Sequence, residues 1–201
     1  MRKILAFSIF ALLAFSSQAT DPVKTETTTY KANTSNSQIA WVGYKVTGKH
    51  MGTIALKDGA LEFDGEKLTG GGFTIDMTTL TVTDLEGKMK DKLEGHLKSA
   101  DFFGIENHPT ASFEITKVAP RDASGGYKVT GDLTIKGITN SIKFNAVVAP
   151  GSDGKTATAD IKVDRSEFDI KYGSGSFFDN LGDKTIYDEF DLSVTLALDR
   201  S

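Results

Sequence analysis

The sequence predicts an all-β fold, an antiparallel β-barrel of about eight strands with one amphipathic helix covering an end. Near the C-terminus, apolar and polar residues alternate strictly, as in a strand with one buried face. Runs of this kind recur along the chain, roughly nine in all. Only one segment has helical periodicity, so the crossover helices of a parallel sheet are missing. A barrel or a sandwich fits these patterns, and closure into a barrel would also hide the sheet edges.

The first nineteen residues (1–19) are expected to be a secretory signal peptide. Arg2 and Lys3 give a positive start, residues 4–15 form a short apolar run, and Ser17 and Ala19 are small residues suited to cleavage. The apolar run is too short and too poorly flanked to span a membrane. We therefore expect a periplasmic or secreted protein, cleaved near Ala19. The sequence contains no cysteine, so it predicts neither a lipoprotein anchor nor disulfides.

The charge balance argues against nucleic acid or anionic lipid headgroups as partners. Without Arg2 and Lys3, the 23 basic residues fall to 21 against 27 acidic ones, so the net charge changes from −4 to −6. Nucleic acids and anionic headgroups both reward clustered basic residues. Beyond the signal peptide, no apolar stretch approaches the roughly 20 residues of a spanning helix, so no transmembrane segment is expected.

The rest of the chain divides into a tether and one domain. Residues 20–37 are polar and lack apolar periodicity, so they predict a flexible N-terminal segment with one short pairing near Tyr30. Residues 38–201 form the barrel domain. We expect its strands at residues 39–46, 53–57, 60–63, 73–77, 111–116, 127–136, 142–148, 156–163 and 187–198.

One helix interrupts the strands after residue 82. Thr83 and Glu86 have the spacing of a capping box, which predicts the start of the helix. An apolar stripe then follows at every fourth residue, and it predicts a helix with one face on an apolar partner. The stripe consists of Leu85, Met89, Leu93 and Leu97.

Two loops carry adjacent phenylalanines. Residues 101–104 contain Phe102 and Phe103, and the Gly- and Ser-rich residues 172–183 contain Phe177 and Phe178. The second loop is too long for a hairpin turn, and we interpret it as a strap across one end of the barrel. Each pair either plugs the core or lines the mouth of a cavity, and the sequence does not decide between these roles.

Four motifs together resemble the YceI-like family. They are Trp41-Val42-Gly43-Tyr44-Lys45, Gly48-Lys49-His50-Met51-Gly52, the run at residues 133–139 and the loop at residues 172–183. The resemblance covers about residues 38–199, and the loop is similar to that of a Bacteroidetes-type branch. It implies an exported, lipocalin-like barrel that binds a polyisoprenoid or a similar long-chain amphiphile.

The residues themselves do not decide whether the interior of the barrel is a cavity or is filled by side chains. Small residues such as Ala111, Gly131 and Ala157 share inward phases with larger ones, which fits either a cavity or the taper of a packed barrel. The resemblance favours a cavity. The candidate ligand-binding residues are then Trp41, Phe73, Ile75, Met89, Leu93, Leu97, Phe102, Phe103, Phe113, Ile115, Leu133, Ile135, Phe144, Ala146, Ala159, Ile161, Phe177 and Phe178.

No catalytic or metal constellation is evident in the sequence. His50, His96 and His108 form no close pairs, and we expect them in a turn, on the helix surface and in a loop, respectively. Asp164 and Arg165 are expected to form an ion pair at a strand end. We therefore expect a carrier or sensor without enzymatic activity and without a cofactor. The alternatives are a lipid-modifying enzyme in the same cavity or a protein-interaction module that uses residues 172–183, and a homodimer is left open.

Overall fold

A computed structural model describes residues 27–201, apart from residues 123 and 153. The expected signal peptide and residues 20–26 lie outside the described residues. The strands are β1 (Thr27–Ala32), β2 (Gln38–Lys45), β3 (Gly48–Asp64), β4 (Lys67–Val82), β5 (Thr110–Pro120), β6 (Gly126–Ile135), β7 (Ile138–Pro150), β8 (Gly154–Asp164) and β9 (Ile186–Arg200). The helices are α1 (Gly87–Lys98) and two short 3₁₀ turns, η1 (Arg165–Phe168) and η2 (Gly182–Lys184).

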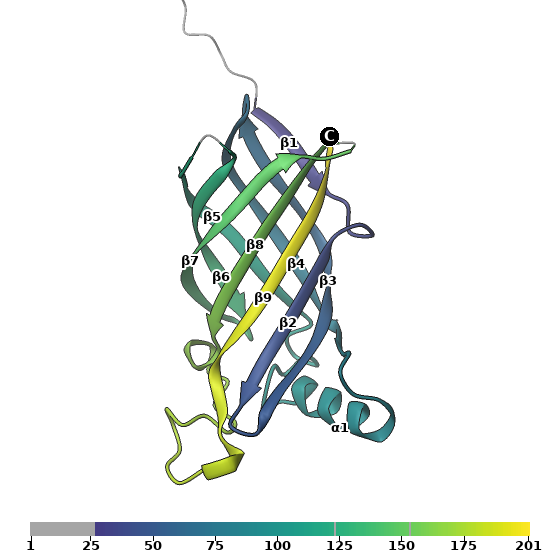
Figure 1. The fold of residues 1–201 in the computed structure, drawn as a ribbon, viewed down its shortest axis with the longest axis vertical. Coiled ribbons are helices and arrows are strands. Elements are labelled where there is room, and N and C mark those ends of the chain that lie inside the picture. Colours follow the sequence, from purple (N-terminus) through teal and green to yellow (C-terminus); the bar gives the residue numbers. More distant parts are fainter. Residues whose placement is uncertain (1–26, 123, 153) are drawn as a thin grey trace, which may run out of the picture.

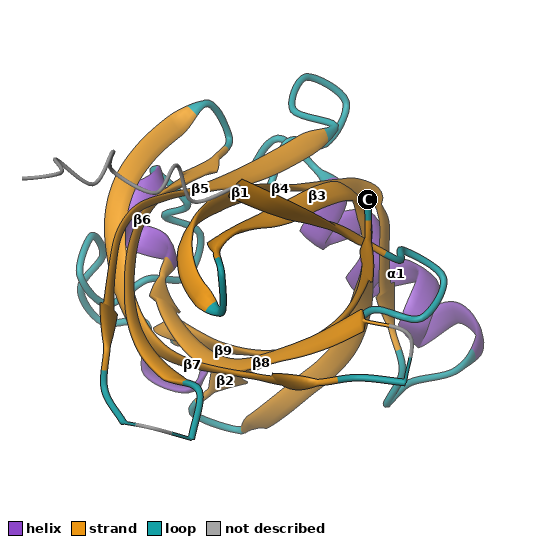
Figure 2. Ribbon diagram, turned by 90° about the horizontal axis from the view of Figure 1, so that it is seen from above, coloured by secondary structure: helices purple, strands orange, loops and turns teal. Residues whose placement is uncertain are grey.

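The strands close into an antiparallel barrel of eight positions, which confirms the predicted fold class (Figures 1 and 2). Around the barrel the order is β3-β2-β9-β8-β7-β6-β5-β4, and β4 returns to pair with β3. Strands β1 and β2 both lie between β3 and β9, one above the other, so together they occupy one of the eight positions. β2 pairs with β3 from Gly48 to Ile54, and β1 pairs with β3 further along, from Ala60 to Asp64.

Part of the segment expected to be a flexible tether belongs to the barrel. β1 lies within residues 20–37 and also pairs with the last strand, through Tyr30 with Arg200 and Ala32 with Leu198. Its Tyr30 ring packs edge-on against Phe63, with 5.3 Å between the ring centroids. The barrel therefore begins before residue 38, and the pairing expected near Tyr30 is that of a full strand, paired with β3 on one side and β9 on the other.

The two ends of the barrel differ in how they are filled. At the end away from α1, which we call the far end, Phe63, Leu68, Val129 and Leu198 are fully buried. The opposite end, which we call the helix end, carries α1, the β2–β3 turn and both 3₁₀ turns (Figure 1). Its buried residues come from both strands and loops. Those outside the strands are Phe102, Ile105, Phe168 and Ile170.

Helix α1 starts later than expected and without the capping box. Thr83 bonds instead to the carbonyl of Met51, and Glu86, the N-cap residue, makes no capping hydrogen bond. The helix is attached to the barrel by Glu94, whose Oε1 accepts hydrogen bonds from Thr81 Oγ1 (2.7 Å) and Val82 N (2.8 Å). Among the described residues, no helix has the length and apolar character needed to cross a membrane.

Candidate ligand-binding site

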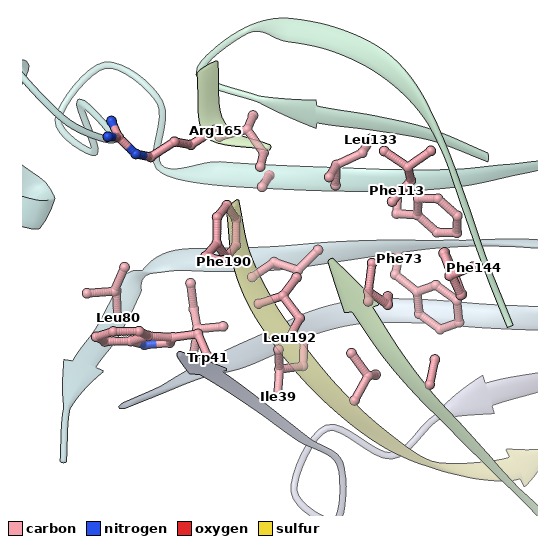
Figure 3. Close-up of a pocket in the computed structure, with 18 of the residues that line it drawn as sticks. Ile39, Trp41, Phe73, Leu80, Phe113, Leu133, Phe144, Arg165, Phe190 and Leu192 are labelled. Carbon is pink, nitrogen blue, oxygen red and sulfur yellow. The ribbon is translucent and has the colours of Figure 1, made fainter. Parts of the chain in front are cut away.

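The inner faces of the strands enclose a cavity of about 360 Å³. Its wall is made almost entirely of the apolar residues of the alternating strands (Figure 3). The cavity runs from the far end, where Leu61, Leu68 and Val129 line it, to the helix end. There the lining includes Tyr187, which is 52% exposed.

Most of the sequence-predicted ligand-binding residues line this cavity. Their placement does not test whether they contact a ligand, which stays a prediction. The helix contributes Leu93 and Leu97, and the following loop contributes Phe102 and Phe103. The others come from the strands and are Trp41, Phe73, Ile75, Phe113, Ile115, Leu133, Ile135, Phe144, Ala146, Ala159 and Ile161.

Met89 does not line the cavity, because only the C-terminal half of the helix faces it. Met89 is 63% exposed, and no residue of α1 is fully buried. Glu94 fixes the rotation of the helix against β4, which directs Leu93, His96 and Leu97 inward. Met89 lies one turn nearer the start of the helix than Leu93, outside the part of α1 that lines the cavity.

Phe177 and Phe178 also lie outside the cavity, with 45% and 50% of their surfaces exposed. Their loop is organised around Ser174, which is completely buried. The Ser174 carbonyl accepts hydrogen bonds from the amides of both phenylalanines, at 3.2 and 3.0 Å. The loop therefore turns the two rings outward, where Lys171 Nζ lies 5.1 Å from the centroid of the Phe177 ring.

Small residues contribute to the cavity in two different ways. Ala111, Ala146 and Ala157 line it directly. Gly131 instead makes room for a protein side chain, since a Cβ there would lie 2.3 Å from Cζ of Phe113. Gly52 makes room both for the backbone of β4 and for Trp41, since a Cβ there would lie 1.8 Å from the carbonyl oxygen of Thr81 and 2.5 Å from the indole Cζ2. Glycine at these two positions thus lets large aromatic residues lie flat against the wall.

Arg165 is a buried part of the site that the sequence did not indicate. It is 2% exposed and lines the cavity at the helix end. Its guanidinium donates to the carbonyls of Ile170 (2.6 Å), Ile186 (2.9 Å) and Tyr187 (3.1 Å). Burial lowers the pKa of this guanidinium, while the carboxylates of Asp188 and Asp164 act in the opposite direction.

The expected ion pair between Asp164 and Arg165 is wrong, because Arg165 pairs with Asp188 instead. Arg165 Nη2 lies 3.2 Å from Asp188 Oδ1, whereas Asp164 accepts a hydrogen bond from the amide of Ser166 at 2.8 Å. Ile186 and Tyr187 lie next to the register shift between β2 and β9 and beyond the last pair of β8 with β9, Asp164 with Glu189. Arg165 supplies hydrogen-bond donors to both of their carbonyls.

The histidines fall into three separate environments. His50 Nδ1 lies 2.9 Å from Asp84 Oδ2, so its bond is to a distant residue and not within its own turn. Burial acts to raise the pKa of Asp84, but bonds from Met51 N and His50 outweigh it, and the pKa lies below its ordinary value. His96 is not a surface residue, because it packs between Phe102 and Tyr172 and lines the cavity. His108 lies in a loop, as expected.

Nothing in the described part of the chain gathers three or more potential metal ligands. The chemistry that the site offers is instead hydrophobic contact, with a few polar groups that lie mostly toward the helix end.

The fold and the site define a closed antiparallel β-barrel with an apolar internal cavity. A family model described as a YceI-like domain matches residues 30–198. The chain belongs to the YceI family. It is 30% identical over 187 residues to protein YceI of Escherichia coli O157:H7, a match that covers 87% of this chain and 91% of that protein. A UPF0312 protein of Pectobacterium carotovorum is 31% identical, but the match spans only 60% of its length and 58% of this chain.

Solved structures share the fold at low sequence identity. BcnA of Burkholderia cenocepacia aligns with a TM-score of 0.62 at 24% identity, covering 82% of this chain and 98% of that one. A polyisoprenoid-binding domain from Saccharophagus degradans aligns with a TM-score of 0.60 at 14% identity, covering 86% and 98%. At these identities the similarity concerns the fold alone.

Proposed function

We propose that this protein is an exported carrier or sensor that holds a polyisoprenoid or a similar long-chain amphiphile in its barrel. The observation that carries the proposal is the apolar cavity of about 360 Å³ inside a closed barrel. Membership of the YceI family supports it, as does the fold shared with a domain described as polyisoprenoid-binding.

The size of the cavity suits a chain of moderate length. A water molecule takes up about 30 Å³ in the liquid, so the cavity has room for roughly 12 groups of about that size. A methylene group is similar in size to a water molecule. Each Å² of apolar surface that such a chain buries contributes about 25 cal/mol, so contact with the wall alone can hold it.

We propose further that the protein does not transform its ligand. In support, the wall around the middle of the cavity is hydrocarbon, and the buried Arg165 is committed to main-chain carbonyls. The alternative is a lipid-modifying enzyme in the same cavity. A bound lipid that is recovered with changed mass after incubation, and unchanged in His50 and His96 variants, would establish that alternative.

The experiment that tests binding is organic extraction of the purified protein followed by mass spectrometry. We expect one long-chain amphiphile per protein. The Ala146→Trp variant should lose it, because Ala146 lines the cavity wall on β7. The control is Asn145→Trp, which adds the same ring to the adjacent, exposed position. Equal lipid contents in the two variants, or a wild-type protein that neither carries nor takes up any lipid, would refute the proposal.

Export remains to be tested by fractionation. We expect the mature protein to begin near residue 20 and to be recovered with the periplasm or the medium. Recovery of a chain that still starts at Met1 in the cytosol would contradict this.

A further inference from the structure

Exposed apolar side chains gather on the outside of the helix end. Of the large apolar side chains that the described residues expose, only Val147 lies elsewhere, on the outer face of β7. The others come from the β2–β3 turn, α1, the loop at residues 172–183 and the start of β9, and each has about half of its surface or more exposed. They are Val46, Met89, Tyr172, Phe177, Phe178 and Tyr187. Single exposed apolar residues are ordinary, whereas a group at one end of a molecule marks an interaction surface.

The segments that carry these side chains are joined to one another. The amide of Val46 donates to the carbonyl of Thr185 at 3.1 Å, which ties the β2–β3 turn to the residues just before β9. The Tyr172 ring packs edge-on against His96 of α1, with 4.3 Å between the ring centroids. The turn, the loop and the helix therefore form one continuous surface at the helix end.

The loop at residues 172–183 holds its two phenylalanines away from the protein. It projects beyond the strands at the helix end, in yellow-green in Figure 1. The amides of Phe177 and Phe178 are bonded to the carbonyl of the buried Ser174, and Ser176 Oγ donates to Asp188 Oδ2 at 2.6 Å. A bonded backbone thus keeps both rings in water, which is unfavourable unless an apolar medium covers them.

The chemistry of this surface fits a lipid bilayer without net charge. Residues 169–184 contain three acidic and two basic residues, a net charge of −1, so the loop has no excess of positive charge that would attract anionic headgroups. Tyr172 and Tyr187 accompany the two phenylalanines, and tyrosine suits a membrane interface because its ring is apolar and its hydroxyl is polar. A projecting tip can enter a fluid layer without the matched surface of roughly 800 Å² per partner that a stable protein contact needs.

We propose that the helix end docks on the surface of a lipid bilayer whose headgroups carry no net charge, and that Phe177 and Phe178 enter it. Because Tyr187 is exposed and also lines the cavity, docking brings the helix end of the cavity next to the bilayer. The inference rests on the proposed function, since a bilayer is where a carrier of long-chain amphiphiles loads or delivers its ligand. The experiment below measures docking and not bound lipid, so the two proposals fail separately.

The test is sedimentation of the protein with phosphatidylcholine vesicles. The wild-type protein should sediment with them, and the double variant Phe177→Ser, Phe178→Ser should lower the partition coefficient roughly tenfold or more. The control is Val147→Ser, which removes an exposed apolar side chain on β7 and should leave docking unchanged. Docking should also be the same at about 0.05 and 0.5 M salt, because it does not depend on charge.

A second measurement keeps both phenylalanines in place. The sequence contains no cysteine, so Asp179→Cys creates a single labelling site beside the two rings for an environment-sensitive fluorophore. Its emission should shift to the blue when phosphatidylcholine vesicles are added. The same label at Asn145→Cys, an exposed position on β7, should show no shift.

Four results would overturn the proposal. They are equal sedimentation of the wild type and the double variant, a label at residue 179 that does not shift, binding only to anionic phosphatidylglycerol vesicles with loss in salt, and a wild-type protein that ignores vesicles. In the last case, a dimer or a complex with another protein that the double variant abolishes would assign the surface to that partner. Extracted lipid without docking would leave the proposed function intact, and docking by a protein that never carries lipid would remove the proposed function alone.

Discussion

At the scale of single residues, Arg165 shows how a buried charged side chain can donate hydrogen bonds to several main-chain carbonyls. The register between β2 and β9 shifts at the helix end, and Ile186 and Tyr187 lie beyond the last pair of β8 with β9. A guanidinium has five N–H groups in a fixed plane and can therefore serve several carbonyls at once. Arg165 uses this property to tie η1, the following loop and β9 together.

We predict that Arg165→Met lowers the free energy of unfolding by about 3 kcal/mol, since it leaves three carbonyls and Asp188 uncompensated. Urea-induced unfolding measures the effect. The control is Lys162→Met, which breaks exposed ion pairs with Asp191 and Glu189 and should leave the midpoint almost unchanged. Equal midpoints in the two variants would mean that Arg165 contributes nothing beyond a surface ion pair.

At the scale of elements, the helix joins the cavity wall through one half of its length. Leu93 and Leu97 line the cavity, whereas Met89, one turn earlier, is exposed. The same substitution at Leu93 and at Met89 therefore separates a role in ligand binding from a general effect on the helix.

We expect Leu93→Asp to reduce bound lipid roughly tenfold or more, because a carboxylate facing the cavity must be desolvated or must displace the helix. Met89→Asp should retain its lipid. Lipid per protein and the unfolding midpoint of the delipidated form are measured together for both variants. If lipid and midpoint fall together in Leu93→Asp, the helix is ordinary core, and equal retention in both variants removes the helix from the site.

The attachment of the helix should depend on pH through Glu94. Hydrogen bonds from Val82 N and Thr81 hold the pKa of the Glu94 carboxyl below its ordinary value. A carboxyl with a lowered folded-state pKa stabilises the fold fully above its unfolded pKa, about 4.3, and this contribution is lost as the pH falls through the lowered value. The helix should therefore loosen below about pH 4.3.

Amide hydrogen exchange of α1 between about pH 3 and pH 6, corrected for the intrinsic pH dependence of exchange, measures this loosening. Glu94→Gln should show weak protection and little further change across this range. A wild-type helix whose corrected protection is constant across the range would show that Glu94 does not hold it.

At the scale of the whole molecule, the sequence predicted the features that follow from a regular alternation of apolar and polar residues. Alternation along the strands placed residues such as Phe113 and Leu133 on the inner face, because successive side chains of a strand point to opposite sides. It did not place Phe177 or Phe178, since a loop has no period and its direction is set by bonds to Ser174. The importance of Arg165 and His96 arises from contacts that follow no sequence period, including those with the more distant Tyr187 and Tyr172, so no local pattern could show it.

The barrel should also depend on its first strand. A variant that starts at residue 33 loses the pairing of β1 with both β3 and β9, and it exposes two strand edges. We expect a lower unfolding midpoint and self-association in size-exclusion chromatography, compared with a variant that starts at Thr27. Monomers of equal stability would show that β1 adds nothing to closure.

The pairing of β1 with β9 brings the two ends of the described chain to one corner of the barrel. Asn33 Nδ2 donates to Asp199 Oδ2 at 3.0 Å across a separation of 166 residues. Contacts between such distant parts of a chain form late, since a long loop must first be closed. The corner cannot be assembled until the last strand has been synthesised. A chain that stops before Leu198 therefore lacks the pairs that β1 makes with β9, and one edge of β1 is left with unpaired backbone groups.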